Sequence, residues 1–127
     1  MSNTLAISEI GQISVNAHDL DRATAFYRDV LGMEYLFSAG NMAFLMCGGV
    51  RLMLGVAEKP EFDHRSSILY FKVDDILAAH QDLAAKDVHF EQEPLLVHPA
   101  EDHDLWLAFF RDTEDNVMAL MSEVPRD

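Results

Sequence analysis

The sequence contains a single cysteine among its 127 residues, Cys47, so no disulfide can form within the chain. This excludes a secreted scaffold that depends on disulfides, and a chain of this length can bury a core without cross-links or a structural metal. Basic residues are also scarce, because nine Lys and Arg stand against 22 Asp and Glu and give a formal net charge of −13. A nucleic-acid-binding surface needs the opposite charge, so we expect no nucleic-acid partner.

Long hydrophobic runs are missing as well. No uninterrupted apolar stretch reaches the length that crosses a bilayer, and the first nine residues lack the basic start and apolar stretch of a signal peptide. We therefore expect a cytoplasmic protein without a membrane partner. The residues that are present are 50% hydrophobic and 24% charged, which is the balance of a folded globular domain.

The first half of the chain predicts a strand, a helix and three further strands. Apolar and polar residues alternate over residues 10–17, which indicates a half-buried strand. Asp19 is a typical N-cap, and apolar residues then recur at helical spacing until Gly32 ends the helix. The three further strands are predicted at residues 33–37, 42–47 and 50–56.

The same pattern begins again after a linker at residues 58–65. A shift of 56 positions places the first strand and the helix N-cap on residues 68–73 and Asp75, which indicates an internal repeat. The remaining elements of this second copy are predicted as a long loop at residues 92–104 and strands at residues 88–91, 105–110 and 117–122.

The repeat determines the expected domain organisation. Residues 1–127 form a single domain, with one βαβββ repeat at about 9–57 and a second at about 66–123. Each copy has a sheet with one face that must be covered. The expected fold class is therefore α+β, with two βαβββ repeats whose sheets curve around a shared cup-like cavity.

Two segments of the chain carry a family resemblance. Residues 10–21 (IGQISVNAHDLD), followed by residues 25–32 (AFYRDVLG), resemble the opening of proteins of the vicinal oxygen chelate superfamily, the glyoxalase, bleomycin-resistance and extradiol-dioxygenase group. Residues 110–120 (FRDTEDNVMAL) are similar to the closing segment of that family, with Thr113 in place of the usual proline and Asp115 in place of the usual glycine. Aspartate tolerates a left-handed backbone, so we expect the closing turn to be kept.

The resemblance also has implications for metal binding and assembly. In metal-dependent members, four ligands on the first and fourth strands of each copy hold a divalent ion, and the matching positions are Gln12, Met53, Ile68 and Ala119. Only Gln12 offers an oxygen donor, so we expect neither the family's metal centre nor another cofactor. Chains of this family with two copies commonly pair, and the repeated sheet edges also favour a homodimer.

Strand alternation, read on this fold, gives the candidate ligand-binding residues in the cup. They are Gln12, Ser14, Asn16, Met53, Tyr70 and Ala119. This mixture of apolar side chains and a few polar groups is typical of small-molecule pockets. A cup filled by its own side chains is the alternative interpretation.

The loop at residues 92–104 and the residues after it are rich in chemically distinctive side chains. We expect His98, His103 and Trp106 to line the mouth of the cup, to contact the ligand and to gate its entry. One alternative is a substituted metal site built on the two histidines. The other is a solvated acidic loop, which is favoured because the spacing of the histidines matches no established ligand motif.

These observations support a small-molecule-binding protein of the glyoxalase and bleomycin-resistance kind, without assigning a catalytic residue. The second hypothesis is a metal-dependent lyase, isomerase or dioxygenase of the same superfamily that uses a rearranged site. The third is an interaction subunit with a closed cup. Fold resemblance does not decide between them, because one scaffold carries many chemistries.

Overall fold

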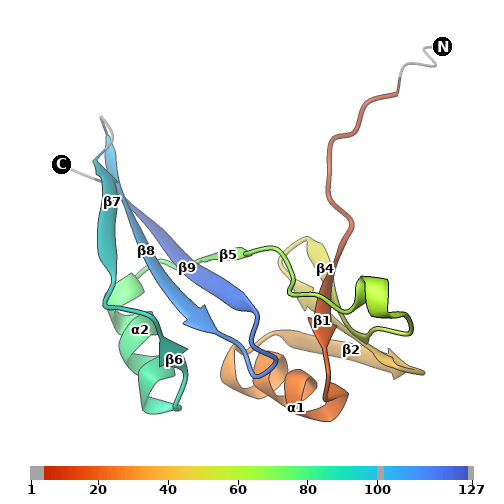
Figure 1. The fold of residues 1–127 in the computed structure, drawn as a ribbon. Coiled ribbons are helices and arrows are strands. Elements are labelled where there is room, and N and C mark those ends of the chain that lie inside the picture. The colour runs from red at the N-terminus through yellow and green to blue at the C-terminus, as the bar shows by residue number, and fades with distance from the viewer. Residues whose placement is uncertain (1–4, 100–101, 126–127) are drawn as a thin grey trace.

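The computed structural model describes residues 5–99 and 102–125 and forms two β-sheets, each with one helix (Figure 1). The first half of the chain contains β1 (Gln12–Ala17), α1 (Leu20–Ala25), the π-helical turn η1 (Phe26–Val30), β2 (Glu34–Ala39), β3 (Met42–Cys47) and β4 (Val50–Val56). The second half contains the 3-10 turn η2 (Pro60–Phe62), β5 (Tyr70–Lys72), α2 (Ile76–Ala85), β6 (His89–Phe90), β7 (Leu95–Pro99), β8 (His103–Arg111) and β9 (Val117–Pro125).

The two sheets share one topology. The strand order is β1-β4-β3-β2 in the first sheet and β5-β9-β8-β6 in the second, where β7 also pairs with β8. In both sheets the first strand lies at an edge and runs parallel to the last strand, while the other pairs are antiparallel. The predicted α+β class with two βαβββ repeats is therefore confirmed.

Both helices begin at the predicted aspartates. The side chain of Asp19 accepts a hydrogen bond from the backbone N–H of Arg22 at 3.0 Å, and that of Asp75 accepts one from the N–H of Ala78 at 3.1 Å. The first helix ends with a π-helical turn, in which the N–H of Leu31 donates to the carbonyl of Phe26 at 3.0 Å. Gly32 follows with a φ of +79°, a conformation that favours glycine. No helix in the described part of the chain is long and apolar enough to span a membrane.

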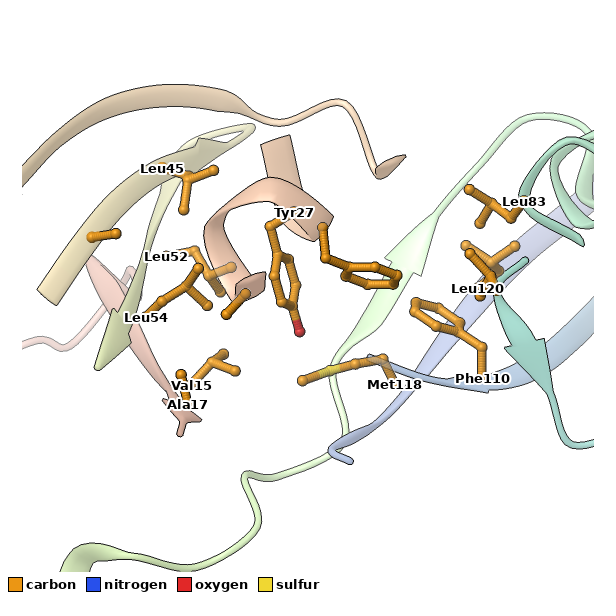
Figure 2. Close-up of a cluster of buried hydrophobic side chains, with 14 of the residues drawn as sticks. Val15, Ala17, Tyr27, Leu45, Leu52, Leu54, Leu83, Phe110, Met118 and Leu120 are labelled. Carbon is orange, nitrogen blue, oxygen red and sulfur yellow. The ribbon is translucent and has the colours of Figure 1, made fainter. Parts of the chain in front are cut away.

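One apolar core joins the two halves. Figure 2 shows Tyr27 of η1 between Leu52 and Leu54 of the first sheet and Met118 of the second. Tyr27 is fully buried, and the ring of Phe26 contacts it edge-on at a centroid distance of 5.4 Å. The core therefore uses the helix-side face of each sheet, and the opposite faces remain for other contacts.

The predicted loop at residues 92–104 is wrong, because β7 occupies much of it. Strand β7 pairs antiparallel with β8, and the register runs from Leu95 opposite Leu107 to Pro99 opposite Asp104. Proline disfavours a central strand but is tolerated at an edge, where its missing N–H is not needed. Strand β7 has only β8 as a neighbour among the described residues, so Pro99 at its end is compatible with a hairpin.

Candidate functional site

A pocket lies on the face of the first sheet that points away from the core. Ser14 pairs with Met53 across β1 and β4, while their neighbours Val15, Leu52 and Leu54 point into the core. The pocket has a volume of about 580 Å³. Its lining includes the predicted residues Ser14, Asn16 and Met53, and it comes entirely from residues 14–67 in the described part of the chain.

The linker forms the outer wall of this pocket. Lys59, Phe62 and His64 of the linker, and Ser66 and Ser67 directly after it, line the pocket together with the strands. These side chains add a cationic group, an aromatic ring, an imidazole and two hydroxyls to the serine and methionine of the sheet. The linker was predicted only as a connection, because its residues show no periodic pattern that indicates another role.

Hydrogen bonds hold the linker against β1. The backbone N–H of Asn16 donates to the hydroxyl of Ser66 at 2.7 Å, and its side-chain amide donates to the carboxylate of Asp63 at 3.0 Å. The Nε2 atom of His18 lies 2.7 Å from the same carboxylate oxygen. The amide of Asn16 and the ring of His18 lower the pKa of the Asp63 carboxyl below its usual range, so this anchor is ionised at neutral pH.

The positions that the resemblance assigns to a metal do not supply a ligand set. The Nε atom of Arg51 donates to the side-chain oxygen of Gln12 at 2.7 Å, and the amide nitrogen of Gln12 lies 3.7 Å from the sulfur of Met53. Ile68 and Ala119 have aliphatic side chains, and Ala119 is fully buried. A hard divalent ion requires oxygen or imidazole donors. The residues present therefore do not fit the family's metal.

Tyr70 and Ala119 lie on the second sheet, where they pair with each other across β5 and β9. The ring of Tyr70 contacts Phe109 edge-on at 6.0 Å and is about half exposed. Neither residue lines the pocket on the first sheet. The structure thus brings together Ser14, Asn16 and Met53, and it places Tyr70 and the buried Ala119 on the other sheet.

His103 and Trp106, which were expected together at the mouth of the cup, lie on opposite faces of β8. His98 lies in β7 opposite Leu105, and its side chain is outside the described residues. The two ring nitrogens of His103 contact different carboxylates, Asp102 at 2.7 Å and Glu123 at 3.3 Å. These carboxylates lie on opposite sides of the ring and cannot share one ion with it. No group of three metal-binding side chains occurs within residues 5–99 and 102–125.

Trp106 is placed differently from the expected position at the mouth. It has the same strand parity as Ala108 and Phe110, which are fully buried, and it packs partly buried against the core. Its ring therefore lies on the helix side of the second sheet. The signal was present in the sequence, because residues two apart on a strand share a face.

Glu114 connects the closing turn to the start of α1, a link that the sequence analysis missed. Its buried carboxylate accepts hydrogen bonds from the backbone N–H groups of His18 and Asp19, both at 2.8 Å, and from Nε of Arg22 at 2.9 Å. Burial alone would raise the pKa of Glu114, but the hydrogen bonds from Arg22, Asp19 and His18 outweigh it and lower the pKa to about 2. The carboxylate is therefore charged at neutral pH.

The rest of the closing turn supports the same junction. The hydroxyl of Tyr27 donates to Asp112 at 2.7 Å, and the side-chain amide of Asn116 donates to the backbone carbonyl of Asn16 at 2.8 Å. Asn116 also accepts from the N–H of Ser66 at 2.9 Å, so the turn holds the linker as well. Asp115 has a φ of +65°, which confirms the expected left-handed conformation at this position.

Comparisons with known proteins agree with this fold. Residues 9–120 match the family model of the glyoxalase/bleomycin resistance protein/dioxygenase superfamily. A lactoylglutathione lyase from Agrobacterium tumefaciens is 25% identical, covers 91% of this chain and 94% of its own length, and gives a TM-score of 0.70. A superfamily member from Sphaerobacter thermophilus gives 20% identity, coverage of 94% and 100%, and a TM-score of 0.77.

A third solved structure has a different description. The integron cassette protein from V. cholerae is 21% identical, with coverage of 94% of this chain and 98% of that one and a TM-score of 0.74. A comparison with curated proteins gives no match. The structures below 25% identity establish similarity of fold alone.

Proposed function

Because the chain belongs to the glyoxalase/bleomycin resistance protein/dioxygenase superfamily, we propose that it binds a small molecule in the pocket on β1 and β4. The observation that carries this proposal is the pocket itself. Its volume of about 580 Å³ suits a small ligand, and its lining combines apolar Met42, Met53 and Phe62 with the hydroxyls of Ser14 and Ser66. Apolar contacts provide affinity there, while the few polar groups orient the ligand.

Binding without the family's metal is part of this proposal. The support is the donor chemistry of the four implied positions, of which only Gln12 has an oxygen, and that oxygen already accepts a hydrogen bond from Arg51. The second candidate function, an enzyme with a rearranged metal site, needs converging histidines and carboxylates. The described part of the chain gives it no support, because the two carboxylates at His103 contact different ring nitrogens.

A homodimer is also part of the proposal. The pocket takes its lining from the first sheet and the linker, so one side of a closed cup is missing in the single chain. The second sheet carries partly exposed apolar residues on its own outer face, including Ile68 and Tyr70. A second copy that places this face over the pocket would cover both surfaces and bring Tyr70 to the ligand.

The remaining parts of the proposal concern the cellular setting. The lone Cys47 supports a reducing compartment, and we propose the cytoplasm. The net charge of −13 supports a partner that is a small molecule and not a nucleic acid.

The proposed site is tested by filling it. Ser14→Phe places a ring in the pocket, and Ser38→Phe is the matched control because Ser38 is exposed on β2, outside the pocket lining. Ligands are first found by ligand-observed NMR with a library of small aromatic amides and acids. We expect these ligands to lose binding to Ser14→Phe and to keep it with Ser38→Phe. Equal binding to both variants would place the ligand elsewhere.

A further inference from the structure

The chain ahead of β1 is an extended arm with large exposed aliphatic side chains. Figure 1 shows residues 5–11 leaving the body of the molecule above β1. Leu5 is 84% exposed and Ile7 is 87% exposed. The end of the arm next to β1 is held by the hydrogen bond from the N–H of Arg51 to the carbonyl of Gly11 at 3.1 Å.

A second group of exposed apolar side chains lies at the far end of the second sheet. We call residues 95–97 of β7 the tongue, and leave out the neighbouring ends of β8 and β9 because they carry the carboxylates of Asp104 and Glu123. Figure 1 shows β7 extending beyond α2. Leu95, Leu96 and Val97 of the tongue are all exposed. Strand β7 is also an edge strand, so its outer backbone groups are open to a further strand among the described residues.

The charge of the protein restricts which surfaces two copies can bring together. With a net charge of −13, copies of this chain repel each other wherever acidic side chains meet. Residues 5–8 of the arm and residues 94–97 at β7 contain no charged side chain. These two segments can therefore come into contact without burying a carboxylate, which would be costly.

The geometry points to a contact between two copies, and we propose that the arm of one chain docks Leu5 and Ile7 on the tongue of a second copy. This inference rests on the proposed homodimer, in which the second sheet of one copy faces the first sheet of the other. The arm leaves the first sheet at β1, next to the pocket, so it enters the space beside the partner's second sheet.

Strand β2 also carries exposed apolar side chains, but it is a poorer docking surface for the arm. On β2, the ring of Phe37 already stacks on Phe44 at a centroid distance of 4.6 Å, and the guanidinium of Arg28 lies 5.9 Å from the ring centre of Tyr35. These side chains have partners in their own chain. The aliphatic side chains of β7 offer a surface that matches the aliphatic side chains of the arm.

The first test measures the dimer dissociation constant by sedimentation equilibrium. The double variant Leu5→Ser with Ile7→Ser removes the apolar face of the arm without touching the core, so its melting temperature should match the wild type. We expect its dimer to dissociate at least about tenfold more readily, because burial of two aliphatic side chains is lost. Leu77→Ser is the matched control, since Leu77 is 59% exposed on α2, and its dissociation constant should be unchanged.

The second test locates the contact by cross-linking. In a Cys47→Ala background, chains with Ile7→Cys are mixed with chains carrying Leu96→Cys and oxidised. We expect a disulfide between the two different chains, whereas neither variant alone should form it efficiently.

A wild-type dimer whose dissociation constant is unchanged in the double arm variant would overturn the docking alone and leave the pocket proposal intact. Absence of the mixed disulfide would also overturn it. A wild-type chain that sediments as a monomer would overturn the docking together with the proposed dimer, and the Ser14→Phe experiment would still decide the pocket.

Discussion

At the scale of single residues, Glu114 joins the two halves of the chain through its carboxylate. It lies in the closing turn of the second half and accepts from two backbone N–H groups and one arginine at the start of α1. Its pKa of about 2 lies below the ordinary value of 4.5, so the unfolded chain takes up a proton more readily than the folded chain. The stability that Glu114 contributes is complete above about pH 4.5 and is lost as the pH falls toward 2.

Glu114→Gln should therefore lower the free energy of unfolding by about 2–3 kcal/mol at about pH 7, and the difference from wild type should shrink by roughly half by about pH 3. Urea denaturation at both pH values measures this. Glu61→Gln is the control, because Glu61 lies exposed in η2, and it should match wild type throughout. If the loss were the same at both pH values, the charge of Glu114 would not be its cause.

The residue scale also shows what alternation predicts well and where it was not applied. Ser14, Asn16 and Met53 lie near one another on one face of the first sheet, as alternation predicts, because strand parity is a local property of the backbone. The predicted position of Trp106 at the mouth of the cup was based on its nearness to a predicted loop. Strand parity with Phe110 would have placed Trp106 on the helix side of the sheet, where it lies in the structure. Glu114 was not predicted, because its partners lie more than 90 residues away.

At the scale of elements, the linker around η2 was predicted as a connection, and in the structure it lines the pocket. The N-caps at Asp19 and Asp75 were predictable, since each bonds to an N–H three residues ahead. The role of Asp63 was not, since it depends on Asn16 and His18, which are 47 and 45 residues away. Strand β7 was missed for a related reason, because its formation depends on pairing with β8 and its own residues show no clear periodic pattern.

Asp63→Ala should weaken binding of a pocket ligand, because the linker that lines the pocket loses its contacts with Asn16 and His18. The ion pair with His18 is exposed, so the free energy of unfolding should change by less than about 1 kcal/mol. Calorimetric titration with a ligand from the NMR screen measures the affinity, and thermal unfolding checks the stability. Glu61→Ala, in the same linker, should leave both unchanged. An Asp63→Ala protein with wild-type affinity would show that the linker does not shape the site.

At the scale of the whole molecule, one core covers the inner face of both sheets and leaves their outer faces for binding. The repeat predicted this shared topology, because the same hydrophobic pattern in both halves forms the same sheet. Periodicity did not predict how the halves are placed, which depends on Tyr27 and the polar closing turn that packs against the first half. The pocket and the second sheet's outer face are thus separate surfaces in one chain, and the proposed dimer brings them together.

Metal-independent binding in the pocket is tested most directly by titrating a pocket ligand into the protein before and after treatment with EDTA. Because Met53, Ile68 and Ala119 offer no oxygen or imidazole donor, we expect the dissociation constant to be the same in both titrations. Loss of binding after chelation, with recovery when one equivalent of a divalent transition metal is added back, would contradict the proposed function.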